Sequence, residues 1–398
     1  MGEHPMTQAT VEDPRVEAAS AAQSKPEFEV DPWVHFLGGF VSRHPRLWQR
    51  LGDLESRALS SALAGVRIEA PVYVVGLARS GSTMLLEVLN WLDEVATHRY
   101  RDFPMLHTPF AWNRFLEFVP LRDRQPVERS HQDRLLVTPD SPEAFEEVLW
   151  MAFFPQLHDP STSAVLDGST RNPAFEAFYR DHIRKLLLVR DGRRYVAKGN
   201  YNITRLEYLL HLFPDARFVL PVREPAWHIA SLMKQHRLFC KGQQANLRAL
   251  THLQRVGHFE FGHDRRPINA GDAARASEVK ALWARGAEVE GWARYWDYIH
   301  SFLADRMARN PRLAEACHLV RYEELCSQPA PTVRATLEHC GLQVSDLLLE
   351  RARQQIRFPS YYRPEFSERE LDLIERHTRA TAERLGIGTR RAQTTISA

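Results

Sequence analysis

The sequence predicts an α/β protein built on a three-layer parallel sheet of the P-loop type, with helical insertions and a helical C-terminal region. Short β-branched runs alternate with amphipathic helical stretches along the chain. The first of these runs leads directly into a glycine- and serine-rich turn and then into a helix. Because parallel strands need long crossover connections, which helices usually supply, the alternation indicates a parallel sheet.

The composition indicates a folded chain with a large core. Of the 398 residues, 44% are hydrophobic and 26% are charged, as in average globular proteins. Lys and Arg number 52 and Asp and Glu 50, so the net charge of +2 gives no overall basic field for nucleic acid or an anionic membrane. The four cysteines are too few for a disulfide framework and show no CxxC spacing.

No segment has the pattern of a signal peptide or of a membrane span. We therefore expect a cytoplasmic protein with reduced thiols and with neither a nucleic-acid nor a membrane partner. The oligomeric state stays open. Residues 1–30 carry no apolar periodicity and are predicted to be a disordered tail, residues 31–66 to form two short helices packed on the main domain, and residues 67–398 to form that domain.

Strands and helices of the main domain can be placed by their patterns. Strands are predicted at residues 71–76, 194–198, 217–222 and 318–322. Helices are predicted at residues 84–92, 203–213, 226–238 and 277–309, and again within 331–386 with an interruption at 357–364. The insertions at residues 104–190 and 239–276 follow strand ends, where such sheets keep their substrate pockets.

The turn after the first strand, Gly76-Leu-Ala-Arg-Ser-Gly-Ser-Thr83, predicts a phosphate site. A helix N-terminus exposes unpaired N–H groups and the positive end of the helix dipole. The spacing is that of the Walker A motif, but Ser82 stands where a nucleotide kinase or NTPase needs a lysine. That class is therefore the alternative rather than the first choice, and Arg79 supplies a cation within the turn instead.

A second candidate anion site follows the strand at residues 217–222. Arg223 stands at the strand end, and Ser231 lies about two turns into the next helix. A guanidinium and a hydroxyl placed in this way can bind one phosphate. The alternative is an Arg223 paired with Glu224 and a serine on the helix surface.

Together, the two segments resemble sulfotransferases that use 3′-phosphoadenosine 5′-phosphosulfate (PAPS). The turn at Gly76 is similar to their 5′-phosphosulfate loop, and Arg223 with Ser231 is similar to their 3′-phosphate motif. The segments 214–225 and 319–325 are also typical of that family. Two departures are Ala78, where the family usually has proline, and the absence of the glycine-rich C-terminal phosphate loop of the animal cytosolic members.

The resemblance implies a role for each matching residue. The 5′-phosphosulfate would be held by Arg79, Ser80, Gly81, Ser82 and Thr83. The 3′-phosphate would be held by Arg223 and Ser231, with Tyr322 near the adenine and Arg353, Arg357 and Arg363 as further candidates for phosphate contacts. A family member that binds nucleotide or a protein without turnover remains an alternative.

Sulfuryl transfer places charge on the bridging oxygen of the leaving nucleotide, so cations aimed there lower the barrier. Arg79 and Lys198 are the candidates; Lys198 matches the strand-end lysine of the family, and its alternative is a surface lysine. A general base is also needed, and the resemblance points to Asp102, with His98 second. The alternative for Asp102 is an ion pair with Arg99 or Arg101.

The acceptor is expected to be the hydroxyl or amine of a small molecule or glycan. His258, His263 and Asp264 have the side chains of metal ligands but lack helical i, i+4 histidine spacing, so no metal site is expected. Aromatic residues of the insertions, such as Trp150 and Phe259, are expected mainly in the core.

Overall fold

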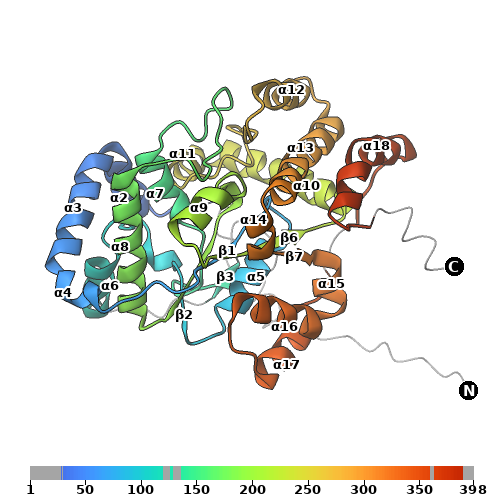
Figure 1. The fold of residues 1–398 in the computed structure, drawn as a ribbon. Coiled ribbons are helices and arrows are strands. Elements are labelled where there is room, and N and C mark those ends of the chain that lie inside the picture. Colours follow the sequence, from blue (N-terminus) through green and yellow to red (C-terminus); the bar gives the residue numbers. More distant parts are fainter. Residues whose placement is uncertain (1–27, 29, 120–125, 129–135, 359–362, 389–398) are drawn as a thin grey trace, which may run out of the picture.

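The computed structural model describes residues 28, 30–119, 126–128, 136–358 and 363–388. Nearly all of the predicted tail at residues 1–30 lies outside the described residues. A five-stranded sheet forms the centre, with the strand order β2-β5-β1-β6-β7 and every pairing parallel (Figure 1). Its strands are β1 (Val72–Val74), β2 (Val95–Ala96), β5 (Arg194–Lys198), β6 (Arg217–Val222) and β7 (Cys317–Arg321).

Strand order and register bring distant parts of the chain to one edge of the sheet. β1 lies between β5 and β6, and Val74 at its end is level with Lys198 at the end of β5. β6 runs on to Val222 beside β7. The turn after β1, Lys198 and Arg223 therefore all lie at the carboxyl edge, which is where open α/β sheets bind ligands.

Helices cover both faces of the sheet, as side-chain alternation along a strand requires. Val72 and Val74 pack on one face with α5 (Ser82–Leu89), α16 (Pro329–Cys340) and α17 (Asp346–Gln355). Tyr73, between them, points to the other face, into a core shared with α8 (Pro173–Arg190), α9 (Leu206–Leu212), α10 (Pro225–Ala245) and α13 (Glu288–Arg309). This arrangement confirms the predicted three-layer α/β class.

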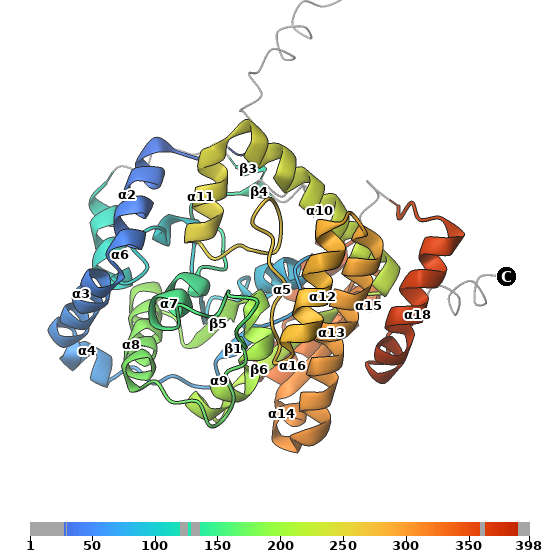
Figure 2. The ribbon, with the colours of Figure 1, turned by 90° about the horizontal axis from the view of Figure 1, so that it is seen from above.

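The N-terminal segment forms three helices rather than the two expected. They are α2 (Pro32–Arg43), α3 (Pro45–Ala58) and α4 (Ser60–Ala64). α3 contacts α8, where the buried Lys185 ammonium donates to the Gly52 carbonyl at 2.7 Å and pairs with Glu55 at 3.1 Å. α2 lies against α11 (Leu247–Arg255), as Figure 2 shows from above.

Other differences from the predicted elements arise where the sequence pattern is short or continuous. The two-residue edge strand β2 and the hairpin of β3 (Val127–Glu128) and β4 (Leu136–Val137) are too short to give a pattern. The helical pattern of residues 277–309 divides into α12 (Ala273–Ala284) and α13, because the chain turns at Gly286 with φ +78°. The predicted helix at residues 203–213 is represented by α9, which follows η2 (Asn200–Thr204). Within 331–386 the structure has α16, α17 and α18 (Glu368–Arg384), with the predicted interruption between the last two.

The remaining elements are η1 (Tyr100–Asp102), α6 (Pro109–Phe118), α7 (Glu146–Phe153), α14 (Pro311–Ala316) and α15 (Tyr322–Ser327). No helix among the described residues is both long and apolar enough to cross a membrane.

Candidate active site

The turn between β1 and α5 has the backbone conformation of an anion-binding loop. The N-cap residue of α5 is Gly81, which has φ +105° and carries no side chain to cap the helix. A Cβ on Gly81 would lie 2.7 Å from Cδ2 of Tyr322, so both the conformation and the space require glycine. The Ser80 hydroxyl is buried and has no hydrogen-bond partner among the described residues.

The two predicted anion motifs contact each other directly. Nε of Arg79 donates to Oγ of Ser231 at 3.3 Å, although 152 positions separate them in the sequence. Arg223 Nη1 donates to the backbone carbonyl of Arg79 at 3.3 Å. Glu224, the alternative partner for Arg223 in the sequence, caps α10 by accepting from the Trp227 N–H at 2.9 Å.

Tyr322 joins the same group from the start of α15. The Arg223 guanidinium carbon lies 4.5 Å from the centre of its ring, which packs against Gly81. The predicted 5′-phosphosulfate loop, 3′-phosphate residues and adenine-side residue therefore lie together at the carboxyl edge of the sheet. Arg353, Arg357 and Arg363 are the further candidates for phosphate contacts. Arg353 pairs with Glu350 at the surface. Arg357 and Arg363 flank residues 359–362, which lie outside the described residues.

A buried histidine supports the turn from behind. Nδ1 of His228 accepts from the Trp296 indole N–H at 3.1 Å, which leaves the ring proton on Nε2 to be donated to the Ala78 carbonyl at 2.8 Å. Burial, with the charge of His300 adding to it, lowers the pKa of His228 well below its ordinary value, so the ring stays neutral. This contact fixes the turn at Ala78, where the resembling family usually has proline.

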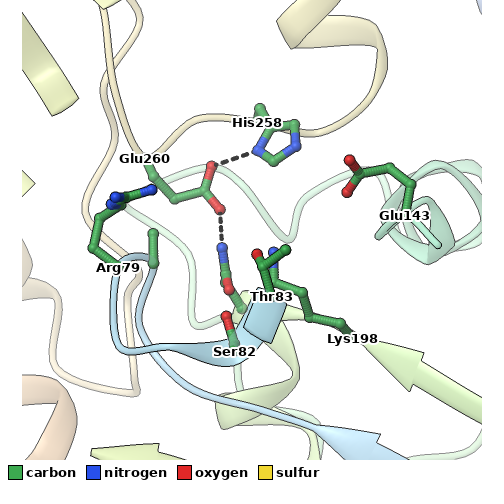
Figure 3. Close-up of a pocket in the computed structure, with 9 residues that line it drawn as sticks. Arg79, Ser82, Thr83, Glu143, Lys198, His258 and Glu260 are labelled. Atoms are coloured by element: carbon green, nitrogen blue, oxygen red, sulfur yellow. Dashed lines mark hydrogen bonds and ion pairs between the residues drawn. The ribbon is translucent and has the colours of Figure 1, made fainter. Parts of the chain in front are cut away.

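A cavity opens in front of the turn, with about 380 Å³ of empty space including its mouth (Figure 3). One wall carries cations and hydroxyls and is formed by Arg79, Ser82, Thr83 and Lys198. The second wall comes from the insertions and from the segment after β5, and carries Glu143, Asn200, His258 and Glu260. Ala78 is the one apolar residue among those that line the cavity in the described part of the chain.

His258, Glu260 and Asn200 form a hydrogen-bonded line on this second wall. Nδ1 of His258 lies 3.2 Å from Oε2 of Glu260, and the Asn200 amide donates to Oε1 of Glu260 at 2.8 Å. Burial alone would raise the pKa of Glu260, but the charge of His258 and the hydrogen bonds from His258 and Asn200 lower it to about 2. The carboxylate is therefore ionised at neutral pH.

Asp102 and His98 do not line this cavity. Asp102 is fully buried and accepts from Arg190 at 2.6 Å, from Asn113 at 2.9 Å and from the Arg99 N–H at 2.8 Å. The expected alternative pairing with the Arg99 or Arg101 guanidinium is also wrong, because both pair with Asp140. These contacts suit a carboxylate that anchors the segment after β2 to the end of α8.

His98 is equally enclosed. Its Nε2 lies 2.9 Å from Nε2 of His182 on α8. Burial, which outweighs the charge of Asp102, lowers the pKa of His98 to about 4. Within the described residues, no group of three or more His, Cys, Asp or Glu side chains is arranged to hold a metal ion.

The sequence pattern indicates no catalytic role for the residues of the second wall. It presents His258 only as a possible metal ligand, together with His263 and Asp264, which do not line the cavity, and it marks neither Glu143 nor Glu260. The available signal was weak: a His-x-Glu pair between Gly257 and Gly262 in an insertion that follows a strand-and-helix unit.

The structure is an α/β fold with a glycine- and serine-containing turn at the carboxyl edge of a parallel sheet. The model of the sulfotransferase family matches residues 71–271, which is half of the chain, and the chain therefore belongs to the sulfotransferase family. It is accordingly a sulfuryl-transferring enzyme, and the nucleotide kinase and non-catalytic alternatives are set aside.

Solved sulfotransferase structures are similar in outline. Sulfotransferase STF9 from Mycobacterium avium is 15% identical, with 84% of this chain and 82% of that chain covered and a TM-score of 0.48. Sulfotransferase STF1 from Mycobacterium tuberculosis is 16% identical, with 95% of this chain and 98% of that chain covered and a TM-score of 0.42. No curated protein sequence matches the chain.

Proposed function

We propose that this enzyme transfers the sulfuryl group of PAPS to a hydroxyl or amine of a small, polar acceptor. The observation that carries the proposal is the direct contact between two predicted anion motifs, through Arg79 and Ser231, at the carboxyl edge of the sheet. Three cations, Arg79, Lys198 and Arg223, and several hydroxyls gathered there suit a ligand with phosphate at both ends.

The residues present fit the donor. The N-terminus of α5, whose N-cap residue is a glycine, and the unpartnered Ser80 hydroxyl offer donors to a 5′-phosphosulfate. Arg79, Ser82, Thr83 and Lys198 line the cavity beside them. In this proposal Arg79 and Lys198 stabilise the charge on the leaving oxygen. Arg223 and Ser231 would hold the 3′-phosphate, and Tyr322 would flank the adenine.

The cavity wall supports a polar acceptor. Apart from Ala78, the residues that line it carry charged or hydrogen-bonding groups, so a hydroxyl-rich or amine-bearing compound would find partners that a steroid or simple phenol would not. Within the described part of the insertions, no aromatic side chain lines it: Trp150 is fully buried and Phe259 packs on His158. We place the reaction in the cytoplasm, since all four cysteines are free thiols.

Calorimetry with adenosine 3′,5′-bisphosphate and with AMP tests the donor half. We expect the bisphosphate to bind at least about tenfold more tightly, because a charge-assisted contact to its 3′-phosphate contributes about 1.5 kcal/mol or more. Replacing Arg223 by Lys removes the planar donor that stacks on Tyr322 and should reduce that preference.

A control is Arg353→Lys, at an exposed ion pair, which should keep the preference unchanged. Equal binding of the two nucleotides by the unmodified enzyme would contradict the proposal. Transfer of labelled sulfate from PAPS to a panel of sugars, amino alcohols, phenols and steroids then identifies the acceptor class, and turnover of the steroids alone would refute a polar acceptor.

A further inference from the structure

We propose that His258 is the general base that takes the proton from the acceptor, with Glu260 and Asn200 as positioning residues. The inference rests on the proposed function, because it concerns the acceptor side of the same cavity. His258 lies on the wall opposite the phosphate turn, across the cavity from Lys198 and Thr83 (Figure 3). A base in that position faces an acceptor held between the two walls.

Hydrogen bonding assigns the two ring nitrogens of His258. An ionised Glu260 can only accept, so the contact at 3.2 Å places a proton on Nδ1 of His258. In the neutral ring, Nε2 then carries the lone pair. The second oxygen of Glu260 is held by the Asn200 amide at 2.8 Å, and Asn200 opens η2 directly after the end of β5. The orientation of the ring is thus set from the sheet itself.

The backbone that carries His258 and Glu260 is held at several points. The Phe259 N–H, between them, donates to the Tyr201 hydroxyl at 2.9 Å. On one side, Gly257 has φ +78° and packs on Glu147, where a Cβ would lie 2.4 Å from Cγ. On the other, Gly262 has φ +86° and packs on the Gln243 amide. A catalytic group needs this kind of support to stay within reach of its proton.

The charges around His258 suit a base that works near neutral pH. Burial on its own would lower the pKa of His258, but Glu260, through charge and hydrogen bond, and Glu143 raise it above 6.5, against the opposing charge of Lys198. The charge of His258 also acts on His252 of α11: burial, together with that charge, lowers the pKa of His252 to about 4, so it is neutral. A base is most effective when its pKa lies near the working pH.

The acceptor hydroxyl gives its proton to Nε2 of His258, and an oxygen lone pair forms the new bond to sulfur. The bond between sulfur and the 5′-phosphate oxygen breaks, and its electron pair stays on that oxygen, beside Arg79 and Lys198. The products are the sulfate ester and adenosine 3′,5′-bisphosphate, and the imidazolium formed on His258 is stabilised by Glu260.

The test compares His258→Gln and Glu260→Gln with His263→Gln, an exposed residue of the same segment. For each, kcat and KM for the acceptor are measured across pH, together with binding of adenosine 3′,5′-bisphosphate and the melting temperature. In the unmodified enzyme, kcat/KM should fall on the acid side with an apparent pKa above 6.5. His258→Gln should lose about 100-fold or more in kcat and lose that acid limb, with bisphosphate affinity unchanged.

Glu260→Gln should move the acid limb to lower pH, because the charge that raises the pKa of His258 is gone, and His263→Gln should change neither. An NMR titration of the His258 ring measures the same decrease in its pKa in enzyme without substrate. The proposal is overturned if His258→Gln keeps both its kcat and the acid limb. It is also overturned if the acid limb is lost in Glu143→Gln rather than in His258→Gln. Failure of the unmodified enzyme to bind the bisphosphate would instead refute the donor assignment, while the NMR titration still decides the state of His258.

Discussion

At the residue scale, Gly81 links backbone geometry to donor binding. Its φ of +105° lies in a region that side chains disfavour, and Tyr322 fills the space where a Cβ would lie. Tyr322 in turn carries the Arg223 guanidinium on its ring. A change at this one position therefore disturbs both the phosphate turn and the residue expected at the 3′-phosphate.

We expect Gly81→Ala to weaken binding of adenosine 3′,5′-bisphosphate by about tenfold or more. The substitution must shift Tyr322 and strain the turn, at a cost of about 1–3 kcal/mol. Calorimetry measures the affinity, and Gly168→Ala is the matched control, because a Cβ there meets nothing within 4 Å. Unchanged affinity in Gly81→Ala would show that the turn does not hold the nucleotide.

Some site residues could be predicted from the sequence because their position follows from local pattern. Arg79 lies in a turn between a strand and a helix, and Arg223 follows a strand, so both must lie at the carboxyl edge of a parallel sheet. Asp102 shows where such reasoning fails. Its partner Arg190 is 88 positions away, at the end of a helix whose packing no local pattern reveals.

At the element scale, α7 places two adjacent carboxylates in the core. Glu146 accepts from Tyr179 and, at 2.6 Å, from Tyr195; burial raises its pKa. Arg205 donates to both carboxylate oxygens of Glu147, at 2.8 and 2.9 Å. Nε2 of His158 lies 2.7 Å from Oε1 of Glu147. Because Gly257 packs on Glu147, this helix also supports the segment that carries His258.

We expect Glu147→Gln to lower the free energy of unfolding by about 3–5 kcal/mol, since it leaves the fully buried Arg205 without a counter-charge. Urea denaturation measures the change. Glu117→Gln breaks an exposed pair with Arg114 and should stay within about 1 kcal/mol of the unmodified protein. A loss equal to that of this control would contradict the account of α7.

Strands and helices differ in how far the sequence determines them. β5 and β6 were predicted at their observed bounds, because both are continuous buried runs that end at charged or turn residues. β2 and the β3–β4 hairpin have two residues per strand, so their existence depends on neighbours rather than on any pattern within them. The division between α12 and α13 rests on a single glycine in a continuous apolar pattern.

At the scale of the whole molecule, buried neutral histidines make stability depend on pH. Burial lowers the pKa of His98, His107 and His300 to about 4 each; nearby charges modify it at His98 and His107, and a hydrogen bond to Trp296 opposes it at His300. In the unfolded chain each ring binds a proton below its ordinary pKa of 6.5. The unfolded state therefore binds more protons than the folded state between these two values.

We expect the free energy of unfolding to be fully present above pH 6.5 and to fall as the pH drops from 6.5 towards 4, by up to about 1.4 kcal/mol per histidine per pH unit. Denaturation series at several pH values measure the slope. A His300→Gln variant should show a shallower slope whatever its stability at pH 7, whereas a variant of the exposed His211 should keep the full slope. A free energy of unfolding that does not change between pH 7 and pH 5 would contradict the prediction.

The hydrogen-bonded line from the Trp296 indole through His228 to the Ala78 carbonyl joins the long helix α13 to the phosphate turn. The shape of that turn is consequently not a property of its own eight residues. Grafting Gly76 to Thr83 onto another sheet would transfer the motif's sequence without the contacts that shape it. Conversely, a substitution at Trp296, on a helix far along the chain, offers a way to change donor affinity.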